Sequence, residues 1–248
     1  MKIRIKFRKW GVMKFIGHLD MMRYFQKAIR RAEIDICYSE GFSPHQIMSF
    51  AAPLGVGITS DGEYFDIEVH STRSTAESLQ ALNATMVDGV ECTGYVQLPD
   101  KAKTAMSIVA AADYQLSYKE GYESPLSTAE WKEKIQTLFE AAEEFTIVKK
   151  SKKSEREVDL KPLVYAFEVR EEEGKPAFFL SVSTGSTDNI KPELVLSSLY
   201  EKLGLAYEEA AIHIHRIEVY ARDVEDGTLV SLLELGQEIA TAKGDKQE

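Results

Sequence analysis

The sequence is short of cysteine and of long apolar runs, and each shortage excludes a class of protein. Its two cysteines, Cys37 and Cys92, lie far apart and form no CxxC pair. This excludes a disulfide scaffold, a zinc ribbon and a cysteine-ligated iron–sulfur cluster. No apolar stretch approaches the roughly 18 residues of a membrane helix, and residues 1–10 alternate charged and apolar side chains, unlike a signal peptide. We therefore expect a cytoplasmic chain with reduced cysteines and no membrane partner.

Motifs for phosphate binding and for radical chemistry are missing as well. There is no Gly-rich P-loop, no GxGxxG after a strand, and no CxxxCxxC triad to hold a [4Fe–4S] cluster. The chain is therefore not itself a radical SAM enzyme, and we expect no cofactor. His213 and His215 lie two apart on a predicted strand and could chelate a metal. Because no third ligand lies near them in sequence, a structural role is the favoured interpretation and no metal is expected.

What the chain does have is an uneven distribution of charge. Its 248 residues are 44% apolar and 28% charged, which is typical of a globular protein, and its net charge of −10 disfavours nucleic acid as a partner. Residues 1–50, however, hold ten basic and four acidic side chains, a net +6, so the other 198 residues carry −16. A second basic island runs from Lys149 to Lys161. Such segregation indicates one basic face; merely solvated charge is the alternative.

Alternation and helical spacing predict a βαββαβ order in the first 99 residues. The predicted elements are strand 2–7, helix 18–33, strand 36–38, extended segment 46–50, strand 63–69, helix 74–83 and strand 90–98. The same order recurs after a linker at 99–104, as strand 114–118, helix 127–144, strand 145–148, hairpin 163–169 with 178–182, helix 192–203 and strand 212–219. We therefore expect an α+β fold of two tandem ferredoxin-like (βαββαβ) units with mainly antiparallel sheets. The expected boundaries are 1–99 and 105–236, followed by a flexible tail at 237–248.

The first predicted strand and the first predicted helix are each basic on one side. The strand places its basic side chains opposite three apolar ones; the basic residues are Lys2, Arg4, Lys6 and Arg8. On the helix, the basic residues fall within an arc of roughly 100°, opposite the apolar stripe; they are Arg23, Lys27, Arg30 and Arg31. The same helix is therefore expected to be apolar on its inner side and cationic on its outer side.

Two histidines and an aromatic residue stand out in the segments next to this helix. His18, in the first helical turn, and His45, after Pro44 in a predicted rigid loop, could contact phosphate or transfer a proton; a lone structural histidine is the alternative for each. Phe42 is either a core residue or an exposed stacking platform, and Trp10 is a second stacking candidate. Asp20 is expected to cap the helix N-terminus.

One further segment could bind an anion. The small and polar residues 183–189 precede the helix that Pro192 opens. Backbone N–H groups before a helix N-terminus can hold a phosphate. A polar turn is the commoner explanation of such a segment.

Taken together, these motifs resemble the radical-SAM-linked domain of unknown function, which occurs alone or fused behind a cobalamin-binding radical SAM enzyme. The matching motifs are KFIGHLD (14–20), YSEGFSPH (38–45), SFA (49–51), PL (53–54), GEYFDI (62–67), EVDLKPL (157–163) and IKPELVL (190–196). Two positions depart from the family pattern: Gly17 replaces a usual Ser, which weakens the helix cap, and Gln46 replaces a usual Pro. The resemblance implies a radical SAM protein as partner and supplies no reaction.

We favour the hypothesis that the chain is an RNA-associated accessory protein that works with a radical SAM enzyme in RNA or ribosome-related modification. Its expected RNA contacts are Lys14, His18, Arg23, Lys27, Arg30, Arg31, Phe42 and His45. One alternative is a protein–protein docking subunit of the radical SAM enzyme that does not bind RNA. Another is a metal-independent ribonuclease that uses His18 or His45 as acid or base. We expect no catalytic activity of its own from the chain.

Overall fold

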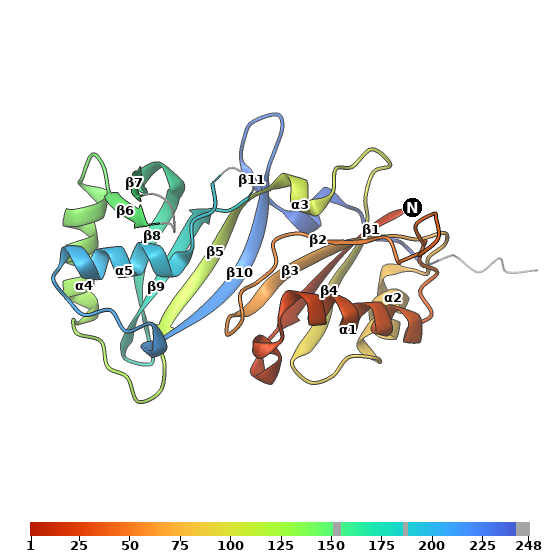
Figure 1. Cartoon of the computed structure of the whole chain (residues 1–248), viewed down its shortest axis with the longest axis horizontal. Coiled ribbons are helices and arrows are strands. Elements are labelled where there is room, and N and C mark those ends of the chain that lie inside the picture. Colours follow the sequence, from red (N-terminus) through yellow and green to blue (C-terminus); the bar gives the residue numbers. More distant parts are fainter. Residues whose placement is uncertain (151–154, 186–187, 242–248) are drawn as a thin grey trace, which may run out of the picture. The chain divides into compact units, whose positions relative to one another are not determined.

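The computed structural model describes residues 1–150, 155–185 and 188–241 (Figure 1). The chain divides into two compact units. The first is formed by Met1–Ala110 with Glu218–Glu248, and the second by Ala111–Ile217. Both units combine helices with mainly antiparallel strands, which confirms the predicted α+β class.

The first unit has the predicted βαββαβ order. Its elements are β1 (Lys2–Lys9), η1 (Gly11–Phe15), α1 (His18–Arg31), β2 (Met48–Phe50), β3 (Thr59–Glu68), α2 (Thr75–Asn83), β4 (Val90–Gln97) and α3 (Ala105–Ile108). The strand order is β4-β1-β3, with β2 paired to β3, and these pairs are antiparallel. This is the arrangement of a ferredoxin-like unit.

Helices α1 and α2 cover one face of this sheet, and Figure 1 shows both on the same side of its strands. The alternation of β1 places Ile3, Ile5 and Phe7 on that face, where all three are buried. The apolar stripe of α1 packs against them, and the rings of Phe7 and Phe25 lie 4.7 Å apart between centroids. The helical spacing of the sequence thus predicts which side of α1 faces the core.

The opposite face of the sheet is covered by segments that the sequence pattern did not predict. They are α3, β11 (Leu229–Ser231) and η5 (Leu232–Leu235). Leu232 is completely buried. A Cβ added at Gly94 of β4 would lie only 2.6 Å from Leu233 Cδ1, so the backbone of β4 and the η5 segment are in close contact. Within the described residues, these segments therefore cover the sheet on the face opposite α1 and α2.

The chain after η5 stays attached to the first unit. Gln237 and Gln97 exchange backbone hydrogen bonds of 2.9 and 2.8 Å, and Ile239 bonds to Thr75. Of the predicted tail at 237–248, residues 242–248 lie outside the described residues. The predicted boundaries of 1–99 and 105–236 follow the repeated element order and stay a prediction; by contacts, Glu218–Glu248 belong with the first unit.

The second unit repeats the same strand order. Its elements are β5 (Val109–Tyr118), α4 (Thr128–Ile135), η2 (Gln136–Glu140), β6 (Thr146–Lys150), β7 (Glu155–Asp159), η3 (Lys161–Leu163), β8 (Val164–Glu172), β9 (Lys175–Ser183), α5 (Pro192–Lys202), η4 (Glu209–Ala211) and β10 (Ile212–Arg222). The start of β5, up to Ala110, and the end of β10, from Glu218, belong to the first unit. The strand order is β10-β5-β9-β8, and the separate hairpin β6-β7 is inserted between α4 and β8. Trp131 of α4 is completely buried and packs against Phe178 and Tyr200. In the described ranges, no helix is long and apolar enough to cross a membrane.

Candidate nucleic-acid interface

The basic side chains of β1 all bond to partners within the first unit. Arg4 and Asp66 form a two-point ion pair, with Arg4 Nε 2.8 Å from Oδ1 and Nη2 3.0 Å from Oδ2. Arg4 also donates to the Leu232 carbonyl, and Lys2 donates to the Ala102 carbonyl. Arg8 pairs with Asp61 at 2.7 Å. The basic side of this strand is therefore not a free phosphate-binding surface.

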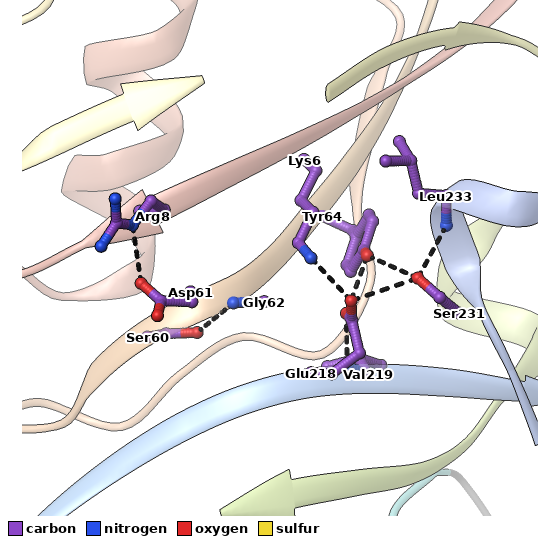
Figure 2. Close-up of polar contacts among 10 residues, drawn as sticks. All are labelled: Lys6, Arg8, Ser60, Asp61, Gly62, Tyr64, Glu218, Val219, Ser231 and Leu233. Carbon is purple, nitrogen blue, oxygen red and sulfur yellow. Dashed lines mark hydrogen bonds and ion pairs between the residues drawn. The ribbon is translucent and has the colours of Figure 1, made fainter. Parts of the chain in front are cut away.

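Lys6 belongs to a polar cluster at one carboxylate, that of Glu218 (Figure 2). Lys6 Nζ lies 2.6 Å from Oε2, and the Tyr64 hydroxyl donates to Oε1 at 2.7 Å. Ser231 donates to Oε2 at 3.2 Å, and the backbone N–H of Val219 donates to Oε1. Burial, and then the charge of Glu218, raise the pKa of the Tyr64 phenol, so Tyr64 stays a neutral donor. These bonds satisfy the Glu218 carboxylate and join the C-terminal part of β10, together with Ser231 of β11, to β1 and β3.

The outer side of α1 presents its positive charges to solvent. Arg23, Lys27, Arg30 and Arg31 are all exposed. Arg30 and Arg31 donate to the carbonyls of Gln26 and Thr85, at 3.3 and 3.2 Å, which leaves their charge uncompensated. Arg23 pairs with Asp20 at 3.2 Å, but both side chains are about two-thirds exposed, so solvent screens this pair. This helix face thus offers positive charge to a polyanion.

A closed loop carries Phe42 next to this helix. The ends of the loop are joined at Ser39 and His45: Ser39 N–H donates to the His45 carbonyl at 2.9 Å, and Ser39 Oγ lies 2.8 Å from His45 Nδ1. Gly41 has a φ of +106°, a conformation that favours glycine. The ring of Phe42 is fully exposed. Phe42 is therefore exposed and not a core residue, and its stacking role stays a prediction.

One hydrogen bond ties this loop to the edge of the cationic helix face. Gln46 Nε2 donates to the Gln26 carbonyl at 3.2 Å, the same carbonyl that accepts from Arg30. At about 100° per residue, Gln26 lies roughly 40° from Arg30 around the helix axis. The loop is thus beside the exposed charges. We call these residues together the loop–helix face; they are Arg23, Lys27, Arg30, Arg31, Phe42 and His45.

The remaining predicted contacts lie in other surroundings. His18 is half-buried. Its ring and that of Phe50 pack edge to face, with 5.3 Å between their centroids. His18 lines a space of about 10 Å³, room for one water molecule at most, together with buried Lys9 and Glu63. The Lys14 ammonium lies 5.2 Å from the centroid of the Phe15 ring. No hydrogen bond joins His18 to His45 in the described part of the chain.

Sequence reasoning misassigned one residue at this site and missed two others. Asp20 was expected to cap α1, but the N-cap residue Gly17 has no side-chain cap bond, and the Asp20 carboxylate accepts from Arg23 instead. Lys9 and Glu63 were not singled out, although both line the space beside His18. The sequence pattern could have indicated Lys9, because this residue continues the alternation of the strand on the side of its apolar residues.

Other candidate sites of the sequence are partly outside what the structure describes. The side chains of the basic residues at 149–156 and residues Ser186 and Thr187 of the possible anion loop lie outside the described residues. His213 and His215 are both half-buried on β10. Among the described residues, no group of three or more His, Cys, Asp or Glu side chains is placed to hold a metal.

Burial raises the pKa of the Cys92 thiol to about 12, so this cysteine is not a reactive thiolate at neutral pH.

Comparison with known proteins identifies the family. Residues 2–192 match the family model described as "Uncharacterized protein conserved in bacteria (DUF2344)". The chain belongs to this family. The family description names no radical SAM partner, so that part of the predicted resemblance stays a prediction.

Two further comparisons say little about function. No curated protein matches the chain. Among solved structures, it is similar to a chain of the "Crystal Structure of a Cbf5-Nop10-Gar1 Complex", with 15% identity and a TM-score of 0.46. The match covers 89% of this chain, and this chain spans half the length of that one. A likeness this distant supports no conclusion about activity.

Proposed function

We propose that this member of the family is an RNA-associated accessory protein that binds RNA through the loop–helix face. The observation that carries the proposal is the fully exposed ring of Phe42, held on a loop that Ser39 and His45 close, beside four exposed cations of α1. A large aromatic ring in water gains free energy when a base covers it. Arginine and lysine next to it supply the contacts that phosphates need.

The same arrangement favours unpaired RNA over a duplex. Stacking on a protein ring requires a base whose face is not already covered by its neighbours. The closed loop also lowers the entropy that would be lost when Phe42 is fixed against a base. We therefore expect single-stranded loops or bulges as the preferred target, with little dependence on base identity because every base has a π-face.

The partner in this proposal is a radical SAM enzyme, and its support is the resemblance of the sequence motifs. The chain lacks the cysteine triad of such an enzyme. Its part would therefore be to hold or present the RNA while the partner modifies it. Purification of a tagged chain from its own cells tests this: we expect a radical SAM protein to remain bound, and its absence under mild conditions would contradict the partnership.

The ribonuclease alternative is not favoured. General acid–base cleavage of RNA needs two groups positioned on the same bond. His45 lies in the exposed loop against Ser39, whereas His18 is half-buried against Phe50, so the two candidates have separate surroundings. A chain that leaves RNA intact during a long incubation would agree with this assignment.

A salt titration with matched variants tests the RNA proposal. Fluorescence anisotropy of a labelled RNA hairpin with an unpaired loop is measured against a blunt duplex of the same stem. With three phosphate contacts, affinity for the hairpin should fall roughly 20-fold between about 50 and 200 mM salt. The triple variant Arg23→Gln, Lys27→Gln, Arg30→Gln should lose most of this dependence.

The control for this titration removes charge elsewhere in the same unit. Lys101→Gln with Lys103→Gln neutralises two exposed lysines outside the loop–helix face. This variant should bind the hairpin like the parent chain. Absence of binding at low salt, or equal losses in the triple variant and the control, would contradict the proposal.

A further inference from the structure

Four aliphatic or aromatic side chains near the N-terminus of α1 are exposed without an obvious partner. Val12, Phe15, Leu19 and Val56 each expose more than 60% of their surface. They come from η1, from the first turn of α1 and from the loop before β3. We call these four residues the apolar patch. Single exposed apolar residues are ordinary, but a group of them on one surface marks an interaction site.

Local structure brings the four side chains to one place. Val12 and Phe15 are three residues apart in the 3₁₀-helix η1, where such residues lie on the same side. The Gly57 N–H donates to the Lys14 carbonyl at 2.8 Å, which anchors the loop of Val56 to η1. A Cβ added at Gly17 would lie 4.0 Å from Val56 Cγ2, so Val56 lies against the residue midway between Phe15 and Leu19.

The segments that carry the patch contain more basic than acidic side chains. Residues 1–19 contain no acidic side chain, and neither do residues 41–60. The Lys14 ammonium lies over the Phe15 ring, and the exposed Arg23 follows Leu19 by one helical turn. Asp20 is the nearest acidic residue in the sequence, and it is paired with Arg23. The patch is therefore apolar at its centre and positive at its edge.

We propose that the apolar patch docks an acidic segment of a partner protein, one that presents apolar anchors flanked by Asp or Glu. Charge complementarity selects this occupant, because carboxylates would meet Lys14 and Arg23 while apolar anchors cover the patch. A second copy of this chain would bring equal positive charges together. RNA does not match the chemistry, because Val12, Leu19 and Val56 offer no ring for a base to stack on. The four patch residues are distinct from the residues of the loop–helix face, although Arg23 borders both surfaces, and the patch does not depend on RNA binding.

Peptide binding tests this docking surface. The probes are a panel of fluorescent amphipathic peptides with Leu and Phe on one side and Glu on the other, with a Lys-for-Glu version and a scrambled version of each. We expect at least one acidic amphipathic peptide to bind, and neither of its controls. Phe15→Gln with Leu19→Gln should weaken that binding at least tenfold, whereas Val224→Ser, at another exposed apolar residue of the first unit, should not.

Further measurements on the same double variant distinguish the other occupants. The Phe15→Gln, Leu19→Gln variant should retain the parent's unfolding midpoint and its RNA affinity, which separates this surface from the loop–helix face. Equal binding of acidic and basic peptides, or no binding by any acidic peptide, would overturn the proposal. So would binding to anionic phosphatidylglycerol vesicles that the double variant abolishes, or a dimer in sedimentation that the double variant converts to monomer.

Discussion

Two basic elements of the first unit, β1 and α1, carry the same number of basic residues on their polar sides and use them differently. On β1 each of the four charged groups bonds to an acidic side chain or a carbonyl, and Arg8 is the one of them that is exposed. On α1 they remain exposed. The difference is in the surroundings, since the polar side of each element carries four basic residues.

The comparison shows how little net charge says about a binding surface. A buried guanidinium such as that of Arg4 has lost its hydration and needs its carboxylate partner to remain stable. An exposed one such as Arg30 keeps its hydration and can exchange it for a phosphate. Positive charge on β1 therefore contributes to folding, whereas positive charge on α1 remains available to a ligand.

The largest effect expected is on stability, from breaking the Arg4–Asp66 pair. Arg4→Ala leaves Asp66 buried without its partner and should lower the free energy of unfolding by about 3–5 kcal/mol. Urea unfolding followed by circular dichroism measures this. Lys27→Ala on α1 should change the free energy of unfolding by less than about 0.5 kcal/mol.

A double variant sharpens that result. Arg4→Met with Asp66→Leu replaces the pair by apolar side chains of similar size and should recover most of the loss. If Arg4→Ala and Lys27→Ala lowered the free energy of unfolding by the same amount, the two basic elements would not differ in the way described.

The next largest effect concerns RNA affinity. Phe42→Ala should weaken binding to an unpaired RNA loop by about 1–3 kcal/mol, because one base loses its stacking surface. Phe42→Trp should retain the affinity. Because Phe42 is fully exposed, neither change should move the unfolding midpoint, and a Phe42→Ala variant with parental affinity would exclude this ring from the interface.

A smaller effect is expected from a single charge on α1. Lys27→Gln should reduce the slope of log affinity against log salt by about 0.7, the value for one phosphate contact on a single strand. Lys6→Gln on β1 should leave this slope unchanged, because Lys6 is already paired with Glu218. Equal slope changes for the two variants would show that the β1 charge also reaches the RNA.

The smallest effect concerns the start of α1. Helices α2 and α4 begin with capping boxes, Ser74 with Glu77 and Ser127 with Glu130, whereas α1 begins at Gly17 without a side-chain cap bond. Gly17→Ser should stabilise the chain by a few tenths of a kcal/mol. The backbone of Gly17 is extended and its added Cβ meets only ordinary contact. A loss of stability, measured by thermal unfolding, would contradict this.

Local patterns in the sequence were sufficient for the main helices and strands of the two repeated units and for their order, although not for α3, β11 and η5. The alternation of β1, the apolar stripe of α1 and the Ser127 start of α4 each depend on neighbouring residues, so they are visible in a short window. The hairpin between β8 and β9 was also predictable from Gly174, whose φ is +77°.

The surfaces could not be predicted in this way, because their partners are distant in the sequence. Asp66 lies 62 positions from Arg4, and Glu218 lies 212 positions from Lys6. No local pattern indicates that η5 covers the sheet. The sequence also left the exposure of Phe42 open, because an aromatic residue in a loop can pack into the core or face solvent. The exposure of Leu19 could be predicted from the sequence, since helical spacing places this residue in the exposed arc of α1.

Photo-cross-linking tests the central claim most directly. A hairpin RNA with 4-thiouridine in its unpaired loop is irradiated with the chain, and the modified residues are identified by mass spectrometry. The account predicts cross-links at Phe42 and the neighbouring residues 39–45, which disappear in the Phe42→Ala variant. Bound RNA that cross-links only to residues of β1 or of the second unit would contradict it.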